Sequence, residues 1–183
     1  MGQYLALLRG INVGGKNLIR MTELAACFVE HGFRSVVTYI QSGNVLFEAR
    51  IASSVDLARQ LEEMLAERFR YRASVVLQDR RQLGGVVRRA PDGFGARPGH
   101  ERYDVLFLKP PLTARLAIQS VPMQKGVDRV SAGPGVLYFS RLIRRAAESR
   151  LPRLVSMPIY QSMTIRNWNT TTRLLELMEK SEG

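Results

Sequence analysis

Apolar positions in the first half of the chain follow two different periods. Short apolar or β-branched runs are typical of strands, and two longer segments repeat apolar residues at helical spacing. Between two of the short runs lies Gln41-Ser42-Gly43-Asn44, which is typical of a hairpin turn. We expect strands over 4–8, 35–40, 45–47 and 73–77, and helices over 22–31 and 53–69. Thr22, and Ser53 or Ser54, are the expected helix N-caps, and the order predicts a β-α-β-β-α-β, or ferredoxin-like, unit.

The second half repeats this order. We expect strands over 103–108, 127–131, 136–139 and 162–166, and helices over 113–120, 140–151 and 170–180. Ser140 is the expected N-cap of the middle helix. Between the halves, a helix over 80–90 precedes a stretch over 91–99 that is rich in Gly and Pro. The sequence therefore predicts an α+β protein with two ferredoxin-like subdomains, residues 1–78 and 103–183, joined by a helix and linker over 79–102 and ending in a C-terminal helix.

The two halves also share local patterns, which indicates a duplication. Residues 4–9 resemble residues 103–108 at an offset of 99 positions, and residues 43–47 resemble 134–138 at an offset of 91. The first half therefore holds 8 additional residues between its first strand and its hairpin. The segment Gly10 to Asn17 has this length, whereas the second half has only Pro110-Pro111 there. Because the fold does not require this loop, we expect it to carry function.

The charge balance is strongly basic. Lys and Arg number 27 against 16 Asp and Glu, which gives a formal net charge of +11, and arginine supplies almost all of the excess. A basic surface attracts polyanions such as nucleic acid and phosphorylated ligands, although an arginine-rich solvated surface alone explains the composition equally well.

The remaining composition excludes several classes of protein. No apolar run approaches the roughly 18 residues that a membrane span needs, so no membrane association is expected. The first residues lack the features of a secretory signal, so we expect a cytoplasmic protein. With Cys27 as the single cysteine and His31 and His100 as the only histidines, neither a disulfide nor a zinc site is expected, and we predict no metal and no cofactor. Cys27 is expected to be a buried core residue.

The glycine-rich loop has the skeleton of a phosphate-binding P-loop, Gly10-x4-Gly15-Lys16. A nucleotidase is disfavoured because Asn17 replaces the Ser or Thr that holds magnesium, and because the next helix begins too late. A simpler anion-binding nest and a plain flexible loop both remain open. Near the other end of the chain, Arg166 is a candidate anion clamp, Asn169 the expected N-cap of the last helix and Trp168 its hydrophobic staple.

Three separated motifs resemble those of a known protein family. They are residues 7–17 (LLRGINVGGKN), 38–44 (TYIQSGN) and 164–170 (TIRNWNT). Their order and spacing are similar to the bacterial domain-of-unknown-function family 1697. This resemblance implies a cytoplasmic α+β protein with two similar subdomains, and it implies no established activity.

Three functions remain open. The first is a binding module for a phosphate-bearing partner, either nucleic acid or a nucleotide-like small molecule. The second is an enzyme acting on an anionic substrate positioned by Ser42, Asn44 and Asn167, for which no catalytic residue is identified. The third is an interaction module for an acidic protein. The candidate ligand-binding residues are Arg9, Asn12, Gly14, Gly15, Lys16, Asn17, Ser42, Gly43, Asn44, Arg166, Asn167 and Asn169.

Overall fold

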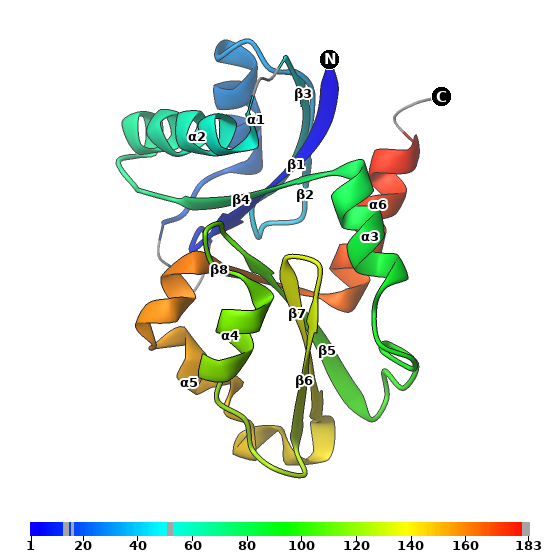
Figure 1. Cartoon of the computed structure of the whole chain (residues 1–183). Coiled ribbons are helices and arrows are strands. Elements are labelled where there is room, and N and C mark those ends of the chain that lie inside the picture. Colours follow the sequence, from blue (N-terminus) through cyan, green and yellow to red (C-terminus); the bar gives the residue numbers. More distant parts are fainter. Residues whose placement is uncertain (13–14, 16, 51–52, 181–183) are drawn as a thin grey trace. The chain divides into compact units, whose positions relative to one another are not determined.

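The computed structural model describes residues 1–12, 15, 17–50 and 53–180 (Figure 1). The chain divides into two compact units. The first comprises Met1–Leu83 and Leu177–Gly183, and the second comprises Gly84–Glu176.

The first unit contains one four-stranded sheet with helices on one face. Its elements are β1 (Gly2–Arg9), α1 (Met21–Glu30), β2 (Arg34–Tyr39), β3 (Asn44–Ala49), α2 (Ser54–Phe69) and β4 (Ser74–Asp79). The strands lie in the order β2-β3-β1-β4, and all neighbours are antiparallel. This is the predicted ferredoxin-like arrangement.

The core of the first unit lies between this sheet and the helices α1 and α2 (Figure 1). Buried side chains from β1 and β3 pack against buried side chains from both helices: Ala6, Leu8, Val45, Phe47, Leu24, Phe28, Leu61 and Leu65. Cys27 is fully buried in this core, as expected. Ser53 caps α2, because its side chain accepts a hydrogen bond from the backbone N–H of Asp56 at 3.4 Å.

The predicted cap at Thr22 is wrong. Helix α1 begins at Met21, and its N-cap is Arg20, which makes no side-chain capping bond. The backbone N–H of Leu24 already donates to the Arg20 carbonyl at 3.0 Å, so the first turn starts two residues before the predicted cap.

The second unit has the same sheet topology with different connections. Its elements are β5 (Glu101–Leu108), α4 (Ala114–Ser120), β6 (Asp128–Gly133), β7 (Val136–Leu142), the 3-10 segment η1 (Ile143–Glu148), α5 (Leu151–Val155), the 3-10 segment η2 (Pro158–Ser162) and β8 (Met163–Asn167). The strand order is β6-β7-β5-β8, again antiparallel throughout. Apolar residues of α4 and α5 pack on one face of this sheet. Helices α3 (Arg80–Arg88) and α6 (Trp168–Lys180) each contribute residues to both units.

The predicted helix over 140–151 is wrong. Strand β7 continues to Leu142, and Ser140 pairs with Tyr103 of β5 instead of capping a helix. The capping preference of Ser140 is outweighed because β5 is long enough to hold β7 in the sheet to its end. The helical pattern is divided between η1 and α5, with Pro152 in the first turn of α5.

Equivalent hydrogen bonds relate the two units. The backbone N–H of Leu8 donates to the Gly43 carbonyl at 2.8 Å, and that of Leu108 donates to the Gly135 carbonyl at 3.0 Å. These residues are 100 and 92 positions apart, so the predicted difference of 8 residues is retained, whereas the predicted alignment is shifted by one residue. Most of the difference lies in one connection. Residues 10–20 join β1 to α1, whereas residues 109–113 suffice to join β5 to α4.

Candidate functional site

Three connections of the first unit meet at one edge of its sheet, where β1 and β2 end and β3 and β4 begin. They are residues 10–20, 40–43 and 70–73. The Tyr71 hydroxyl donates to the Arg9 carbonyl at 3.1 Å, and Leu8 donates to Gly43 as described above. We call residues 9–20, 40–43 and 70–73 the cationic edge, for the charges given below.

Asn12 fixes the first of these connections to the second. Its Nδ2 group donates to the carbonyls of Ile19 and Gln41, each at 2.9 Å, and its Oδ1 accepts from the Ile19 N–H at 2.8 Å. The backbone of Asn12 is left-handed, with φ of 53°, a conformation that Asn tolerates better than most residues. The side-chain amide therefore acts as a brace within the protein.

Asn17 closes the same loop on itself. Its Nδ2 group donates to the Gly10 carbonyl at 2.9 Å, and its own carbonyl accepts from the Asn12 N–H at 3.1 Å. Ile11 and Ile19 are buried, so the loop is also held by apolar contact. The candidate residues Arg9, Asn12 and Asn17 thus lie on or next to one connection, and both asparagine side chains hydrogen-bond within the protein.

The hairpin turn over 40–43 is also held by packing and by hydrogen bonds. Gly43 has φ of +73°, and a Cβ at this position would lie 2.6 Å from the Cδ1 atom of Ile11. The buried Asn44 donates to the Tyr39 carbonyl at 2.9 Å and to the Ser42 hydroxyl at 3.1 Å. The predicted site residues Ser42, Gly43 and Asn44 therefore form a turn packed against the loop.

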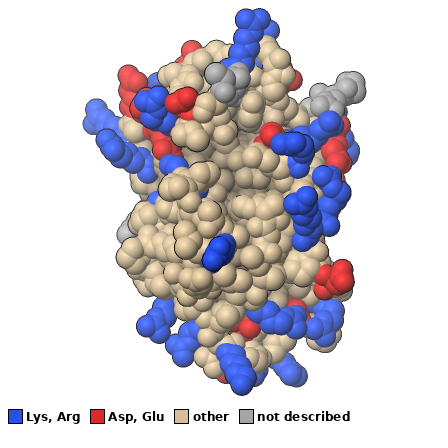
Figure 2. Space-filling model, in the orientation of Figure 1, with Lys and Arg blue, Asp and Glu red and all other residues tan. Residues whose placement is uncertain are grey.

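Every charged residue on the connections that form this edge is basic. Arg20, Arg70 and Arg72 are exposed, and none of them forms an ion pair with any residue that the structure describes. The sequence contains no Asp or Glu over residues 1–22, 31–47 or 68–78. Figure 2 shows Lys and Arg side chains at many places on the visible face, with fewer of Asp and Glu. Such a concentration of positive charge attracts anions.

Gly14 and Lys16 lie outside the described residues. Gly15 is exposed and left-handed, with φ of +74°. The remaining predicted site residues, Arg166, Asn167 and Asn169, belong to the second unit.

Asn167, and not Asn169, caps the last helix. The Oδ1 atom of Asn167 accepts from the Thr170 N–H at 2.7 Å, and α6 begins at Trp168. The predicted N-cap at Asn169 and the staple position of Trp168 are therefore wrong by two residues, because β8 passes directly into the helix without a loop. Arg166 is buried, and its guanidinium donates to the Ile165 carbonyl at 2.8 Å. Burial lowers the pKa of Arg166 to about 10, so the side chain remains a cation at neutral pH.

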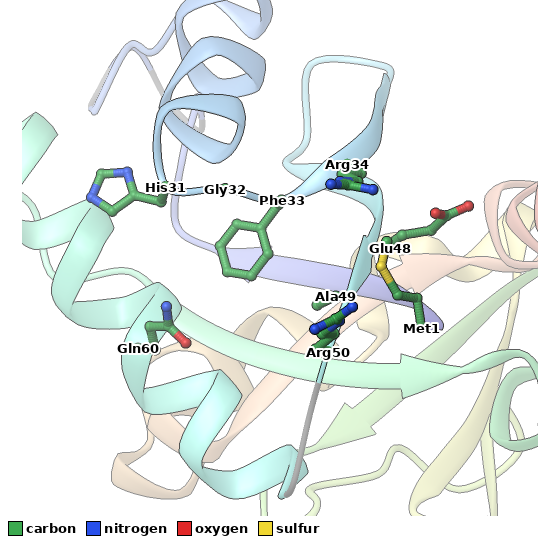
Figure 3. A pocket seen from close by; sticks show the side chains of 9 residues that line it. All are labelled: Met1, His31, Gly32, Phe33, Arg34, Glu48, Ala49, Arg50 and Gln60. Atoms are coloured by element: carbon green, nitrogen blue, oxygen red, sulfur yellow. The ribbon is translucent and has the colours of Figure 1, made fainter.

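A hollow of about 450 Å³ lies at the opposite edge of the first sheet (Figure 3). Phe33 lies between His31 and Gln60 on one side and Met1 and Glu48 on the other. Arg34 and Arg50 also line it, and both are exposed. Both signs of charge are present, so this edge serves as a reference for the cationic edge.

Two buried carboxylates of the second unit, Glu101 and Asp104, lie in β5 and are not among the predicted site residues. Glu101 is 2% exposed and forms ion pairs with Arg97 and Arg129. Asp104 is 9% exposed, and burial raises its pKa, an effect that Arg141 and Arg102 oppose. No sequence signal marks these residues, because both are isolated acids in β5 that lie outside the three sequence motifs. In the described part of the chain, no three His, Cys, Asp or Glu residues gather to hold a metal ion.

Among the described residues, no helix is both long and apolar enough to cross a bilayer. The comparison with curated proteins found no match. A family described as a protein of unknown function (DUF1697) matches residues 1–138, which include the first two of the three sequence motifs. The fold is similar to the solved structure of a conserved bacterial protein, SP0830, from Streptococcus pneumoniae, with a TM-score of 0.83 and 26% sequence identity. That similarity covers 97% of this chain and 98% of the other.

Proposed function

The chain belongs to the DUF1697 family of proteins of unknown function, and from its cationic edge we propose that it binds a phosphate-bearing ligand, either nucleic acid or a nucleotide-like small molecule. The observation that carries the proposal is the set of exposed arginines, Arg20, Arg70 and Arg72, on connections without a single carboxylate. Guanidinium groups bind phosphate oxygens in a two-pronged geometry, which suits them to this ligand.

The backbone of the glycine-rich loop supports the same ligand class. Gly10, Asn12, Gly15 and Asn17 are all left-handed, and turns of this kind can present backbone N–H groups to an anion. Lys16 and Gly14 belong to the same loop in sequence, and in this proposal they complete the cradle. The asparagine braces hold the described ends of the loop, residues 10–12 and 17–20, which reduces the entropy lost on binding.

The nucleic-acid branch is tested by fluorescence anisotropy with a labelled pool of mixed single-stranded oligonucleotides. Each neutralised phosphate contributes about −0.7 to the slope of log affinity against log salt concentration. Three arginine contacts therefore predict a slope of about −2 between about 50 and about 200 mM salt. Arg20→Gln and Arg72→Gln should each weaken binding and make the slope shallower by about 0.7.

Arg34→Gln and Arg50→Gln are the matched controls. They remove the same charge from exposed positions at the opposite edge of the same sheet, and they should leave the slope unchanged. An affinity that does not change with salt concentration, or that falls as much in these controls as in the Arg20 and Arg72 variants, would contradict the nucleic-acid branch. Equal binding of polyglutamate through Arg20 and Arg72 would instead favour an acidic protein partner.

The small-molecule branch is tested by thermal shift with pyrophosphate and ATP. A ligand that binds only the native state raises the melting temperature, by an amount that grows with its concentration. The rise should be absent from the Arg20→Gln/Arg72→Gln double variant and present in the Arg34→Gln/Arg50→Gln double variant. If neither oligonucleotides nor these phosphates bind, the proposal fails.

A further inference from the structure

Strand β5 of the second unit is longer than its neighbour β8. It pairs with β7 from Glu101 to Phe107, but with β8 only from Asp104 to Leu108. A hollow of about 330 Å³ lies at the N-terminal end of β5, beside the point where β8 passes into α6. We call it the β5-end hollow, and Arg102, Asp104, Arg141, Asn167, Trp168 and Asn169 are among the residues that line it.

Asp104 is a buried carboxylate that the protein leaves unsatisfied. Its Oδ2 atom lies 3.5 Å from a terminal nitrogen of Arg141, and the carboxylate accepts no hydrogen bond from any residue that the structure describes. The Nε atom of Arg141 is buried as well and has no acceptor among the described residues. Buried polar atoms in proteins are nearly always hydrogen-bonded, so this adjacent acceptor and donor call for a partner.

Two other buried carboxylates of the same unit have closer partners than Asp104 has. Glu101 is held by Arg97 and Arg129. Asp128 accepts from the backbone N–H groups of Gln124 at 2.9 Å and Arg150 at 2.8 Å through its Oδ2 atom, while its Oδ1 atom has no partner among the described residues. Asp104 has no comparable bonds, although it lines an open hollow.

A ligand in the hollow that satisfies both side chains must present a hydrogen-bond donor to Asp104 and, next to it, an acceptor to Arg141. A ring that carries an N–H group next to a carbonyl group has these groups in this order. We call this side of such a ring the lactam edge. Trp168 also lines the hollow, and its indole is held by edge-to-face contact with Phe94 at 5.1 Å between ring centroids. The volume also falls in the range of small-molecule sites.

We propose that the β5-end hollow binds a nucleobase through its lactam edge, as present in guanine and hypoxanthine. The ring N–H donates to the Asp104 carboxylate, and the adjacent carbonyl accepts from the Arg141 guanidinium. Binding replaces the 3.5 Å contact between the two side chains, which is too long for a good hydrogen bond. Adenine presents the opposite order of acceptor and donor, and would leave both protein groups without a partner.

This inference goes beyond the function proposed above, since it involves no residue of the cationic edge. The experiment is isothermal titration calorimetry of the full chain with guanosine, inosine and adenosine. None of these carries a phosphate, so the result is independent of anion binding. Guanosine and inosine should bind, and adenosine should bind at least about tenfold more weakly.

Variants locate the site. Asp104→Asn and Arg141→Gln should each weaken guanosine binding by about tenfold or more, because each removes one of the two charge-assisted bonds. Glu148→Gln is the matched control, since Glu148 is an exposed acid paired with Arg145 in the same unit. It should bind guanosine as the unmodified chain does. Thermal melting checks that each variant is folded.

Three results would overturn the inference: no heat with guanosine or inosine at low-millimolar concentration, equal affinity for adenosine, or unchanged binding by a folded Asp104→Asn or Arg141→Gln variant. If Asp104→Asn does not fold, the selectivity of the unmodified chain and the Arg141→Gln variant still decide the question.

Discussion

The two units provide a matched pair of glycines that separates backbone strain from steric conflict. Gly43 and Gly135 occupy equivalent turns, with φ of 73° and 69°, and each accepts the same hydrogen bond from the strand beside it. Their surroundings differ. A Cβ on Gly43 would lie 2.6 and 2.8 Å from two atoms of Ile11 and 2.9 Å from the Cβ of Leu8, whereas a Cβ on Gly135 would meet nothing within 4 Å.

The expected losses follow from these distances. A left-handed conformation costs an alanine roughly 1–2 kcal/mol, and the lower entropy of the unfolded chain returns about 0.4–1 kcal/mol. Gly135→Ala should therefore lower the free energy of unfolding by about 1 kcal/mol. At Gly43 the displaced Ile11 adds about 1–3 kcal/mol of overpacking, so Gly43→Ala should lower it by about 2–4 kcal/mol.

Urea unfolding followed by far-UV circular dichroism measures both losses, and the fluorescence of Trp168 follows the second unit separately. The midpoint should fall further for Gly43→Ala than for Gly135→Ala, with an unchanged dependence on urea concentration. Equal losses in the two variants, or a larger loss at Gly135, would refute the argument that the loop presses on the hairpin turn through Ile11.

Two further predictions concern the second unit. Tyr138 is buried and donates to the Val86 carbonyl at 2.6 Å, and burial raises its pKa to about 12. Because the unfolded chain loses this proton near pH 10, the stabilisation is complete below about pH 10 and is lost as the pH rises towards about 12. Tyr138→Phe should lower the free energy of unfolding by about 1 kcal/mol at neutral pH, and this difference from the unmodified chain should shrink above about pH 10. Urea unfolding at several pH values measures the difference. A difference that stays constant with pH would contradict the prediction. Asn167→Ala should lower the free energy of unfolding by about 1 kcal/mol through loss of the α6 cap, whereas Asn169→Ala should change it by less than about 0.5 kcal/mol; similar losses would argue against Asn167 as the cap.

The order of elements could be predicted from the sequence, but the register between the halves could not. The apolar pattern and the turn chemistry at Gly43 and Gly135 determine both β-α-β-β-α-β units. The one-residue error has a physical cause. Residues 5–8 of β1 and 103–108 of β5 are buried without interruption, so neither strand shows the alternation of apolar and polar residues that identifies its faces.

The roles of the polar site residues depend on contacts that are distant in sequence. Asn12 was a candidate ligand group, but its amide is used by Ile19 and Gln41, and only the folded hairpin brings Gln41 there. Asp104 is the reverse case. It sits in an apolar strand and gives no signal, and its significance arises because the paired length of β8 ends beside it. Local sequence identifies which groups are polar, and the sheet decides which of them stay unsatisfied.

Comparison of the two units also indicates why the longer connection exists. The second unit joins strand to helix with residues 109–113, so the topology alone does not require residues 10–20. Ordering each additional residue costs about 1–2 kcal/mol of backbone entropy, and a loop that served only as a connection would gain nothing from it. For the described residues 10–12 and 17–20, the bonds of Asn12 and Asn17 and the burial of Ile11 and Ile19 offset that cost. Their effect is to hold Arg20 at the start of α1, on an edge that also carries Arg72. Fixed positive charge binds an anion with less loss of entropy than mobile charge, which supports the cationic edge as a binding element.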